Sequence, residues 1–189
     1  LSKNYIDNYN PATGDVYSLI PNSNDEDVNE AIKSARAAFP SWSKLKNSER
    51  SSWLEKISNE IHNRLDELAL AESIDNGKPL KLAKSVDIPR ARDNFKFFAT
   101  AIQHFASESH HTSEGMINYT LRKPVGVAAC ISPWNLPLYL FSWKIAPALA
   151  AGNTVVAKPS EITPMTACLL SEICHDIDFP AGVLNIVHG

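Results

Sequence analysis

The sequence predicts an α/β fold built on a parallel β-sheet. Three apolar segments, residues 125–131, 154–157 and 183–187, are short enough for strands and apolar enough for burial on both faces of a sheet. Two helical patterns separate them, and this alternation is typical of parallel sheets. With 189 residues, the chain is long enough to bury a substantial core. The pattern amounts to half of a doubly wound, Rossmann-like sheet.

Composition narrows the possible functions. Apolar residues make up 44% of the sequence and charged residues 21%, which excludes a disordered or collagen-like chain. The net charge of −3 gives no basic field, so we expect no nucleic-acid partner and no anionic membrane surface. The longest apolar stretch, residues 128–151, contains three prolines and would make a poor transmembrane helix. Residues 1–8 show no signal-peptide pattern, and three cysteines without CxxC spacing fit reduced thiols, so we expect a cytoplasmic protein.

The first third of the chain predicts a hairpin followed by helices. Residues 4–20 predict a β-hairpin, because a polar link with Pro and Gly, residues 10–14, separates two strand patterns. A capping box from Ser23 to Glu26 then predicts the start of an amphipathic helix that ends at Pro40.

Two longer helical patterns follow. Apolar residues at spacings of three and four predict a continuous helix over residues 49–76, which Gly77 ends. A third helix over residues 80–105 is expected to bend or break near Pro89, where a backbone donor is missing.

Beyond residue 106 the pattern changes to strands. Residues 117–122 alternate apolar and polar side chains as a half-exposed strand does, and Pro124 ends the strand. Helices are predicted over residues 138–150 and 163–176. Thr163 is expected to be the N-cap of the second, with a proline at its first helical position.

Candidate binding residues follow the first two strands of the sheet, because ligands of such sheets bind beyond the carboxyl ends of the strands. The dinucleotide motif GxGxxG is absent after the first strand, so a nucleotide would not lie over the first helix in the standard way. Asn135, held between prolines, could donate a hydrogen bond to negative charge on a substrate oxygen. Alternatively, it only caps or turns the backbone before the next helix. Trp134 could belong to the core or to a cofactor wall.

The second strand is followed by a cation and an acceptor. Lys158 and Glu161 lie three residues apart and suit the hydroxyls of a ribose. The alternative is an ordinary surface ion pair with a carboxylate at a helix start.

Four short motifs follow one another in the second half of the chain: PVGV at 124–127, ISPWNLP at 131–137, WKIAPALAAGN at 143–153 and KPSEITP at 158–164. In this order they resemble the NAD(P)-dependent aldehyde dehydrogenase superfamily. Residues 9–14 and 37–42 are similar to its N-terminal region, so the resemblance extends over essentially the whole chain. Within the superfamily, residues 87–90, 94–98 and 135–140 look most like the 2-aminomuconate and 2-hydroxymuconate semialdehyde dehydrogenases.

The resemblance implies a role for each candidate residue. Asn135 would stabilise the oxyanion, and Lys158 and Glu161 would bind the adenosine ribose. The Glu161 carboxylate would repel a 2′-phosphate, so NAD is favoured over NADP. In the family, a Cys thiolate attacks the aldehyde, a hydride passes to the nicotinamide, and a Glu-activated water hydrolyses the thioester. The cofactor cleft would be lined by Ile131, Ser132, Pro133, Trp134, Asn135 and Ser160.

The same resemblance implies an organisation. Residues 1–106 would be the N-terminal part of the cofactor-binding domain, 107–123 an oligomerisation arm, and 124–189 the first half of the NAD-binding sheet. We expect this chain to be the N-terminal portion of an incomplete aldehyde dehydrogenase fold without its catalytic domain, and to be inactive by itself. The complete enzyme would be a homodimer or homotetramer that acts on a small-molecule aldehyde.

Arg90 is a candidate substrate residue. Muconic semialdehydes carry a carboxylate far from the aldehyde, and an arginine at the substrate entrance could bind that carboxylate with two hydrogen bonds. The alternative is a surface arginine paired with Asp87 or Asp93.

Other chemistry-bearing residues are not expected to take part. His104, His110 and His111 lack zinc-site spacing, so no metal is expected. None of the three cysteines is expected to be the nucleophile. The sequence leaves two other functions open: a non-catalytic nucleotide-binding or interaction fragment, and a relative that transfers the acyl group to coenzyme A.

Overall fold

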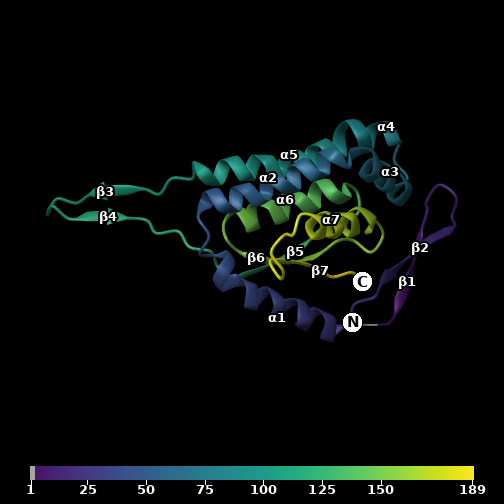
Figure 1. The fold of residues 1–189 in the computed structure, drawn as a ribbon, viewed down its shortest axis with the longest axis horizontal. Helices are drawn as coiled ribbons and strands as arrows, with labels where there is room; N and C mark the ends of the chain where they lie inside the picture. The colour runs from purple at the N-terminus through teal and green to yellow at the C-terminus, as the bar shows by residue number, and fades with distance from the viewer. Residues whose placement is uncertain (1–2) are drawn as a thin grey trace.

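The computed structural model describes residues 3–189 as layers of helices around a short parallel sheet (Figure 1). The sheet contains β5 (Val127–Ile131), β6 (Thr154–Lys158) and β7 (Leu184–Ile186) in that order. All three strands are parallel, and Ile131 lies opposite Lys158 in the register of β5 and β6. The predicted α/β fold with a parallel sheet is therefore confirmed.

Helices cover both faces of this sheet (Figure 1). The crossover helices α6 (Pro137–Ala150) and α7 (Met165–Asp176) lie on one face, because right-handed connections between strands in consecutive order wind the same way. The helix α1 (Asp25–Trp42) packs against all three strands from the other face.

The expected burial of the first strand on both faces is wrong. Among the described residues β5 pairs only with β6 and forms an edge of the sheet, so only Cys130 in it is buried. The central strand β6 has neighbours on both sides and is largely buried, as predicted.

The N-terminal hairpin is confirmed, whereas the start and end of α1 need correction. The strands β1 (Tyr5–Tyr9) and β2 (Val16–Pro21) pair antiparallel. The N-cap of α1 is Asn24, not Ser23, and its partner in the capping box is Asp27. Ser23 instead accepts a hydrogen bond from the backbone N–H of His188 at 3.3 Å. The helix continues through Pro40, because packing on the sheet outweighs the lost hydrogen bond of one proline near its end.

The helix predicted over residues 49–76 is two helices. The helix α2 (Asn47–Asn63) ends at Arg64, and α3 (Leu65–Asn76) starts directly after it. The first packs along α5 and the second against α7, so one straight helix cannot make both contacts. Gly77 ends α3 in the left-handed conformation, as predicted.

The predicted irregularity near Pro89 is a turn of π-helix. The short α4 (Leu80–Leu82) leads into η1 (Ala83–Asp87), and α5 (Ile88–Gln103) follows directly. Pro89 is the second residue of α5, but the chain before it is already helical, so its missing N–H leaves a gap in the helical hydrogen bonds next to the π-helical turn.

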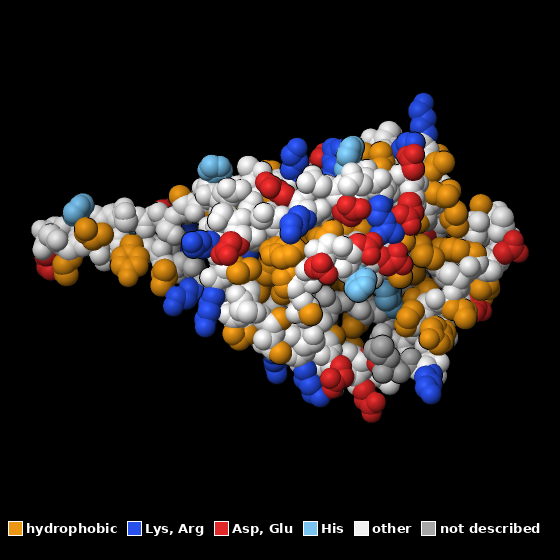
Figure 2. All heavy atoms as spheres, in the orientation of Figure 1, with side chains coloured by type: hydrophobic (Ala, Val, Ile, Leu, Met, Phe, Trp, Pro, Cys, Tyr) orange, Lys and Arg blue, Asp and Glu red, His pale blue; other side chains and the backbone are white. Residues whose placement is uncertain are grey.

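A second hairpin projects from the body of the molecule (Figure 1). It contains β3 (Ser109–His111), which the sequence did not predict, and β4 (Ile117–Tyr119). Apolar side chains lie along this projection in Figure 2, and Ile117, Tyr119 and Leu121 are all exposed.

The core lies between the sheet, α6 and the pair of α2 and α5. Its largest fully buried side chains are Trp42, Phe95 and Phe141. The indole N–H of Trp42 donates to the carbonyl of Leu149 at 3.2 Å, so its polar atom is satisfied within the core.

Gly182 and Gly14 form a matched pair for testing how the sheet packs on α1. Their φ angles are 78° and 79°, but a Cβ on Gly182 would lie 2.8 Å from the carbonyl oxygen of Ser34, whereas one on Gly14 would meet nothing within 4 Å. We expect Gly182→Ala to lower the free energy of unfolding by about 1–3 kcal/mol more than Gly14→Ala, because only the first also overpacks. Urea denaturation measures both, and equal losses would contradict this packing.

Candidate functional site

Two loops lie side by side at the carboxyl edge of the sheet. Residues 132–136 connect β5 to α6, and residues 159–164 connect β6 to α7. The backbone N–H of Ser132 donates to the carbonyl of Lys158 at 3.0 Å, so the parallel ladder continues into the start of the loops. Every predicted cofactor residue lies on these loops or on the last residue of β5 or β6.

Asn135 is exposed in the first loop. The N-cap of α6 is Leu136, and no side chain of the N-cap residue caps this helix. The alternative in which Asn135 caps α6 is therefore not what the structure shows. Among the described residues no hydrogen bond to the Asn135 side chain is found, so its amide can donate to a ligand.

Trp134 lies outside the core. Its side chain is 54% exposed and lines a pocket of about 390 Å³ together with Glu161 and the first hairpin. Its carbonyl accepts hydrogen bonds from the Asn76 amide at 3.0 Å and the Thr163 hydroxyl at 3.2 Å. Thr163 thus joins the two loops. The predicted N-cap role of Thr163 is wrong, because Pro164 is the N-cap of α7.

The other residues of the first loop differ in exposure. Ile131 and Pro133 are exposed, and the carbonyl of Ile131 accepts a hydrogen bond from Lys144. Ser132 is buried, and its hydroxyl has no hydrogen-bond partner in the described part of the chain. A buried polar atom without a partner is costly, so this hydroxyl is ready to accept or donate a bond to a group bound beside it.

The second loop presents a cation and a carboxylate. The ammonium of Lys158 lies 3.4 Å from the carboxylate of Glu161 and 3.3 Å from the carbonyl of Pro159. The backbone N–H of Glu161 and the nearby Lys158 lower the pKa of the Glu161 carboxyl, so it is ionised at neutral pH. Ser160 turns the loop by accepting from the N–H of Ile162 at 3.2 Å. The contact between Lys158 and Glu161 is loose and half-exposed, which leaves both groups able to bind a ligand.

Sequence reasoning missed the polar residues at the end of α3. Asp75 accepts a hydrogen bond from the N–H of Met165, the first residue of α7, at 2.8 Å. Glu72 lies 3.5 Å from the N–H of Leu138 in the first turn of α6. Burial raises the pKa of both carboxyls. Glu72 and Asp75 lie on the same face of α3 as the buried Leu68. This helical spacing is the only signal in the sequence that could have found them.

Arg90 lies on α5, away from both acids proposed as its partners. Asp87 pairs with Lys78 at 2.9 Å, and Asp93 pairs with Arg92 at 2.7 Å. The guanidinium of Arg90 instead lies over the ring of Tyr139 and 3.3 Å from its hydroxyl. It forms no salt bridge with any described residue, so the alternative of a paired surface arginine is not what the structure shows.

The three cysteines are poor nucleophiles in this structure. Burial raises the pKa of Cys130 and Cys168, and it raises that of Cys174 to about 12. A thiol with a raised pKa carries less of the reactive thiolate at neutral pH.

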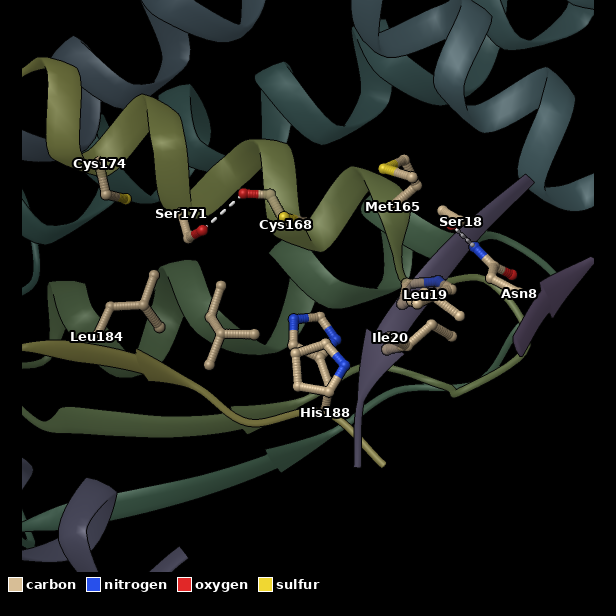
Figure 3. Close-up of a pocket in the computed structure, with 13 residues that line it drawn as sticks. Asn8, Ser18, Leu19, Ile20, Met165, Cys168, Ser171, Cys174, Leu184 and His188 are labelled. Atoms are coloured by element: carbon tan, nitrogen blue, oxygen red, sulfur yellow. Dashed lines mark hydrogen bonds between the residues drawn. The ribbon is translucent and has the colours of Figure 1, made fainter. Parts of the chain in front are cut away.

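A second pocket lies between α7, β7 and β2 (Figure 3). It has a volume of about 330 Å³ and a mostly apolar lining, into which Cys168 and Leu184 point from opposite sides. The residues that the structure describes contain no group of three metal-ligating side chains, and none of their helices is long and apolar enough to cross a membrane.

The protein is of the α/β class, with a parallel sheet and polar loops at the carboxyl ends of its strands. In this class ligands bind at that edge of the sheet. The model of the aldehyde dehydrogenase family matches residues 1–189, and the chain belongs to this family.

Known relatives agree with this assignment. Human 2-aminomuconic semialdehyde dehydrogenase is 52% identical over 186 residues, which cover 98% of this chain and 38% of the human protein. The 2-hydroxymuconic semialdehyde dehydrogenase of Pseudomonas sp. strain CF600 is 46% identical, over 97% of this chain and 39% of its own length. The NAD⁺ complex of an aldehyde dehydrogenase from Bacillus cereus is 37% identical with a TM-score of 0.95, over 98% of this chain and 38% of that chain. The present chain thus spans under two fifths of the length of these relatives.

Ser132 offers a test of the unsatisfied hydroxyl. We expect Ser132→Ala to leave the free energy of unfolding unchanged or raise it by up to about 1 kcal/mol, since no hydrogen bond is lost. The control is Ser142→Ala, which should lower it by about 1–2 kcal/mol. That hydroxyl is buried, donates to the carbonyl of Tyr139 at 2.8 Å and accepts from Asn94 at 2.9 Å. Thermal or urea unfolding compares them, and an equal loss in both would show that Ser132 has a partner in solution.

Proposed function

We propose that residues 1–189 are the N-terminal, cofactor-binding portion of an NAD-dependent aldehyde dehydrogenase that oxidises an aldehyde to a carboxylic acid. The observation that carries this proposal is the pair of adjacent loops, with the free amide of Asn135 on one and the loosely paired Lys158 and Glu161 on the other. The relatives named as semialdehyde dehydrogenases support it. The thiolate and the activating Glu of the family's reaction are not assigned to any residue of this chain.

The donor set fits a dinucleotide. Lys158 and Glu161 can donate to and accept from the hydroxyls of the adenosine ribose, while Ser160 completes the turn that presents them. Ile131, Pro133 and Trp134 offer exposed surface for the flat rings, and the hydroxyl of Ser132 lacks a partner. The ionised Glu161 disfavours a 2′-phosphate, which supports NAD over NADP. When bound, the nicotinamide supplies a hydride acceptor.

The part played by Asn135 follows from the negative charge that develops on the substrate oxygen. An oxygen that gains negative charge during attack on an aldehyde is stabilised by a donor already held in place. The loop that carries Asn135 is stiffened by Pro133 and Pro137, and the carbonyl of Trp134 is bound from two sides. The amide therefore needs little rearrangement when charge develops.

We also propose the organisation that the sequence implies. Residues 1–106 and 124–189 would contribute to one cofactor-binding domain, and the hairpin within residues 107–123 would be the arm that joins copies into a homodimer or homotetramer. The exposed apolar side chains along that hairpin support this role (Figure 2).

The proposed substrates are semialdehydes with a distant carboxylate, such as 2-aminomuconate or 2-hydroxymuconate 6-semialdehyde. Support comes from Arg90, whose guanidinium rests on Tyr139 without an acidic partner among the described residues. Tyr139 lies in the first turn of α6, four residues after Asn135 in the chain, so the start of this helix connects the loop of the oxyanion donor to the residue on which the arginine rests.

The complete protein that contains these residues tests the function directly. We expect it to reduce NAD in the presence of a muconic semialdehyde, and Asn135→Ala to lower kcat by about 10²–10³-fold, because a preorganised donor to the oxyanion is lost. Stopped-flow or steady-state absorbance at the NADH band measures both. Normal turnover by the Asn135→Ala protein would contradict the assigned role, and residues 1–189 alone should show none.

Arg90 should affect one class of substrate. We expect Arg90→Ala to raise KM for an aldehyde with a distal carboxylate by about tenfold or more, since a charge-assisted hydrogen bond is lost, with little change for a neutral aldehyde of the same length. Arg92→Ala is the matched control, because Arg92 lies on the same helix and pairs with Asp93. Equal effects of Arg90→Ala on both substrates would refute the proposed contact between Arg90 and the distal carboxylate.

A further inference from the structure

The last turn of α3 connects the two loops of the candidate site. Three of its polar side chains, those of Glu72, Asp75 and Asn76, contact the loop after β5 or the starts of α6 and α7. The exposed fractions of Glu72 and Asp75 are 0% and 2%, so both acids are removed from water. Buried carboxylates are kept in a structure only where hydrogen bonds or opposite charges compensate for the lost hydration.

Asp75 finds that compensation at the start of α7. One of its oxygens accepts the N–H of Met165 at 2.8 Å, and the other accepts from the Asn8 amide at 2.9 Å and from the hydroxyl of Tyr17. The N-cap of α7 is Pro164, which provides no side-chain cap. Because the free N–H groups at a helix start carry partial positive charge, Asp75 serves as a cap supplied from another helix.

Glu72 and Asn76 act on the first loop and its helix. One oxygen of Glu72 lies 3.0 Å from the ammonium of Lys78, and the other lies 3.5 Å from the N–H of Leu138, where the attraction is mainly electrostatic. The amide of Asn76 donates to the carbonyl of Trp134 at 3.0 Å. The residue next to that carbonyl is Asn135.

The two loops are thus held from one side by a single helical turn. The loop after β5 is bound at Trp134 and, past its end, at Leu138, while the loop after β6 is held just past its end, where Asp75 binds Met165 of α7. No other helix of the described chain forms side-chain hydrogen bonds both to the loop after β5 and to the start of α7, which ends the loop after β6. A shift of this turn would therefore change the separation between Asn135 and the pair formed by Lys158 and Glu161.

We propose that Asp75 and Asn76 are positioning residues for cofactor binding, which set the distance between the two loops. This inference rests on the proposed function. A residue that only stabilised the fold would change the fraction of folded protein and leave the affinity of the folded protein for NAD unchanged. A positioning residue changes that affinity in protein that is fully folded.

Two variants and one control separate these roles in the complete protein. In Asp75→Asn, an amide –NH₂ replaces one acceptor oxygen, so the contact with the N–H of Met165 or those with Asn8 and Tyr17 must weaken. Asn76→Ala removes one hydrogen bond at a partly exposed site. Glu172→Gln is the control, because it weakens a contact between α3 and α7 at their other end, where Glu172 lies 3.1 Å from Arg64.

Isothermal titration calorimetry with NAD and steady-state KM measurements give the readout, after circular dichroism shows that each protein is folded. We expect the dissociation constant and KM for NAD to rise about five- to tenfold in Asp75→Asn and about threefold in Asn76→Ala, the effect of losing one hydrogen bond. Glu172→Gln should leave both values unchanged, and KM for the aldehyde should change less than KM for NAD.

The outcomes are distinct. If Asp75→Asn and Asn76→Ala both bind NAD as tightly as Glu172→Gln does, and the wild type is active, the positioning role alone is overturned. If Asp75→Asn does not fold, Asn76→Ala decides by the same measurement. A wild-type protein that neither binds nor reduces NAD would overturn the proposed function and, with it, this inference.

Discussion

The parallel pairing of β5 with β6 is the interaction on which the candidate site depends. The ladder sets Ile131 opposite Lys158, and its continuation from Ser132 to Lys158 brings both loops to one edge. A slip of one residue would turn Lys158 to the opposite face and separate it from Asn135. The register is held because β6 is buried between α1 and α6, which leaves its side chains one arrangement that packs.

Buried charge then links the site to segments that are distant in the chain. Asp75 joins the N-terminal hairpin, through Asn8 and Tyr17, to the start of α7. Glu72 joins Lys78 to the start of α6. Each bond compensates for a desolvated carboxylate or an uncapped helix start, so the polar groups of this region are satisfied only when the hairpin, α3 and the sheet are assembled together.

The differences between prediction and structure share one physical origin. The hairpin, the end of α3 at Gly77 and the buried strand β6 were predictable, because each depends on local turn chemistry or periodicity. Ser23 loses its expected cap role to Asn24 and bonds to His188, and Thr163 bonds to Trp134 instead of capping α7. Each of these partners is far away in the sequence, so no local rule could select it.

The sequence by itself determined the order of the parallel strands and their crossover helices, the family and the chemical types at the site, including the amide of Asn135 and the Lys158 and Glu161 pair. These follow from side-chain periodicity, turn residues and motif order, which are properties of neighbouring residues. Only the tertiary structure decided that Arg90 rests on Tyr139 instead of pairing with an acid, and that Asp75 caps a helix from another segment. The reason is that desolvation and hydrogen-bond geometry depend on distances between residues that meet only in the folded chain.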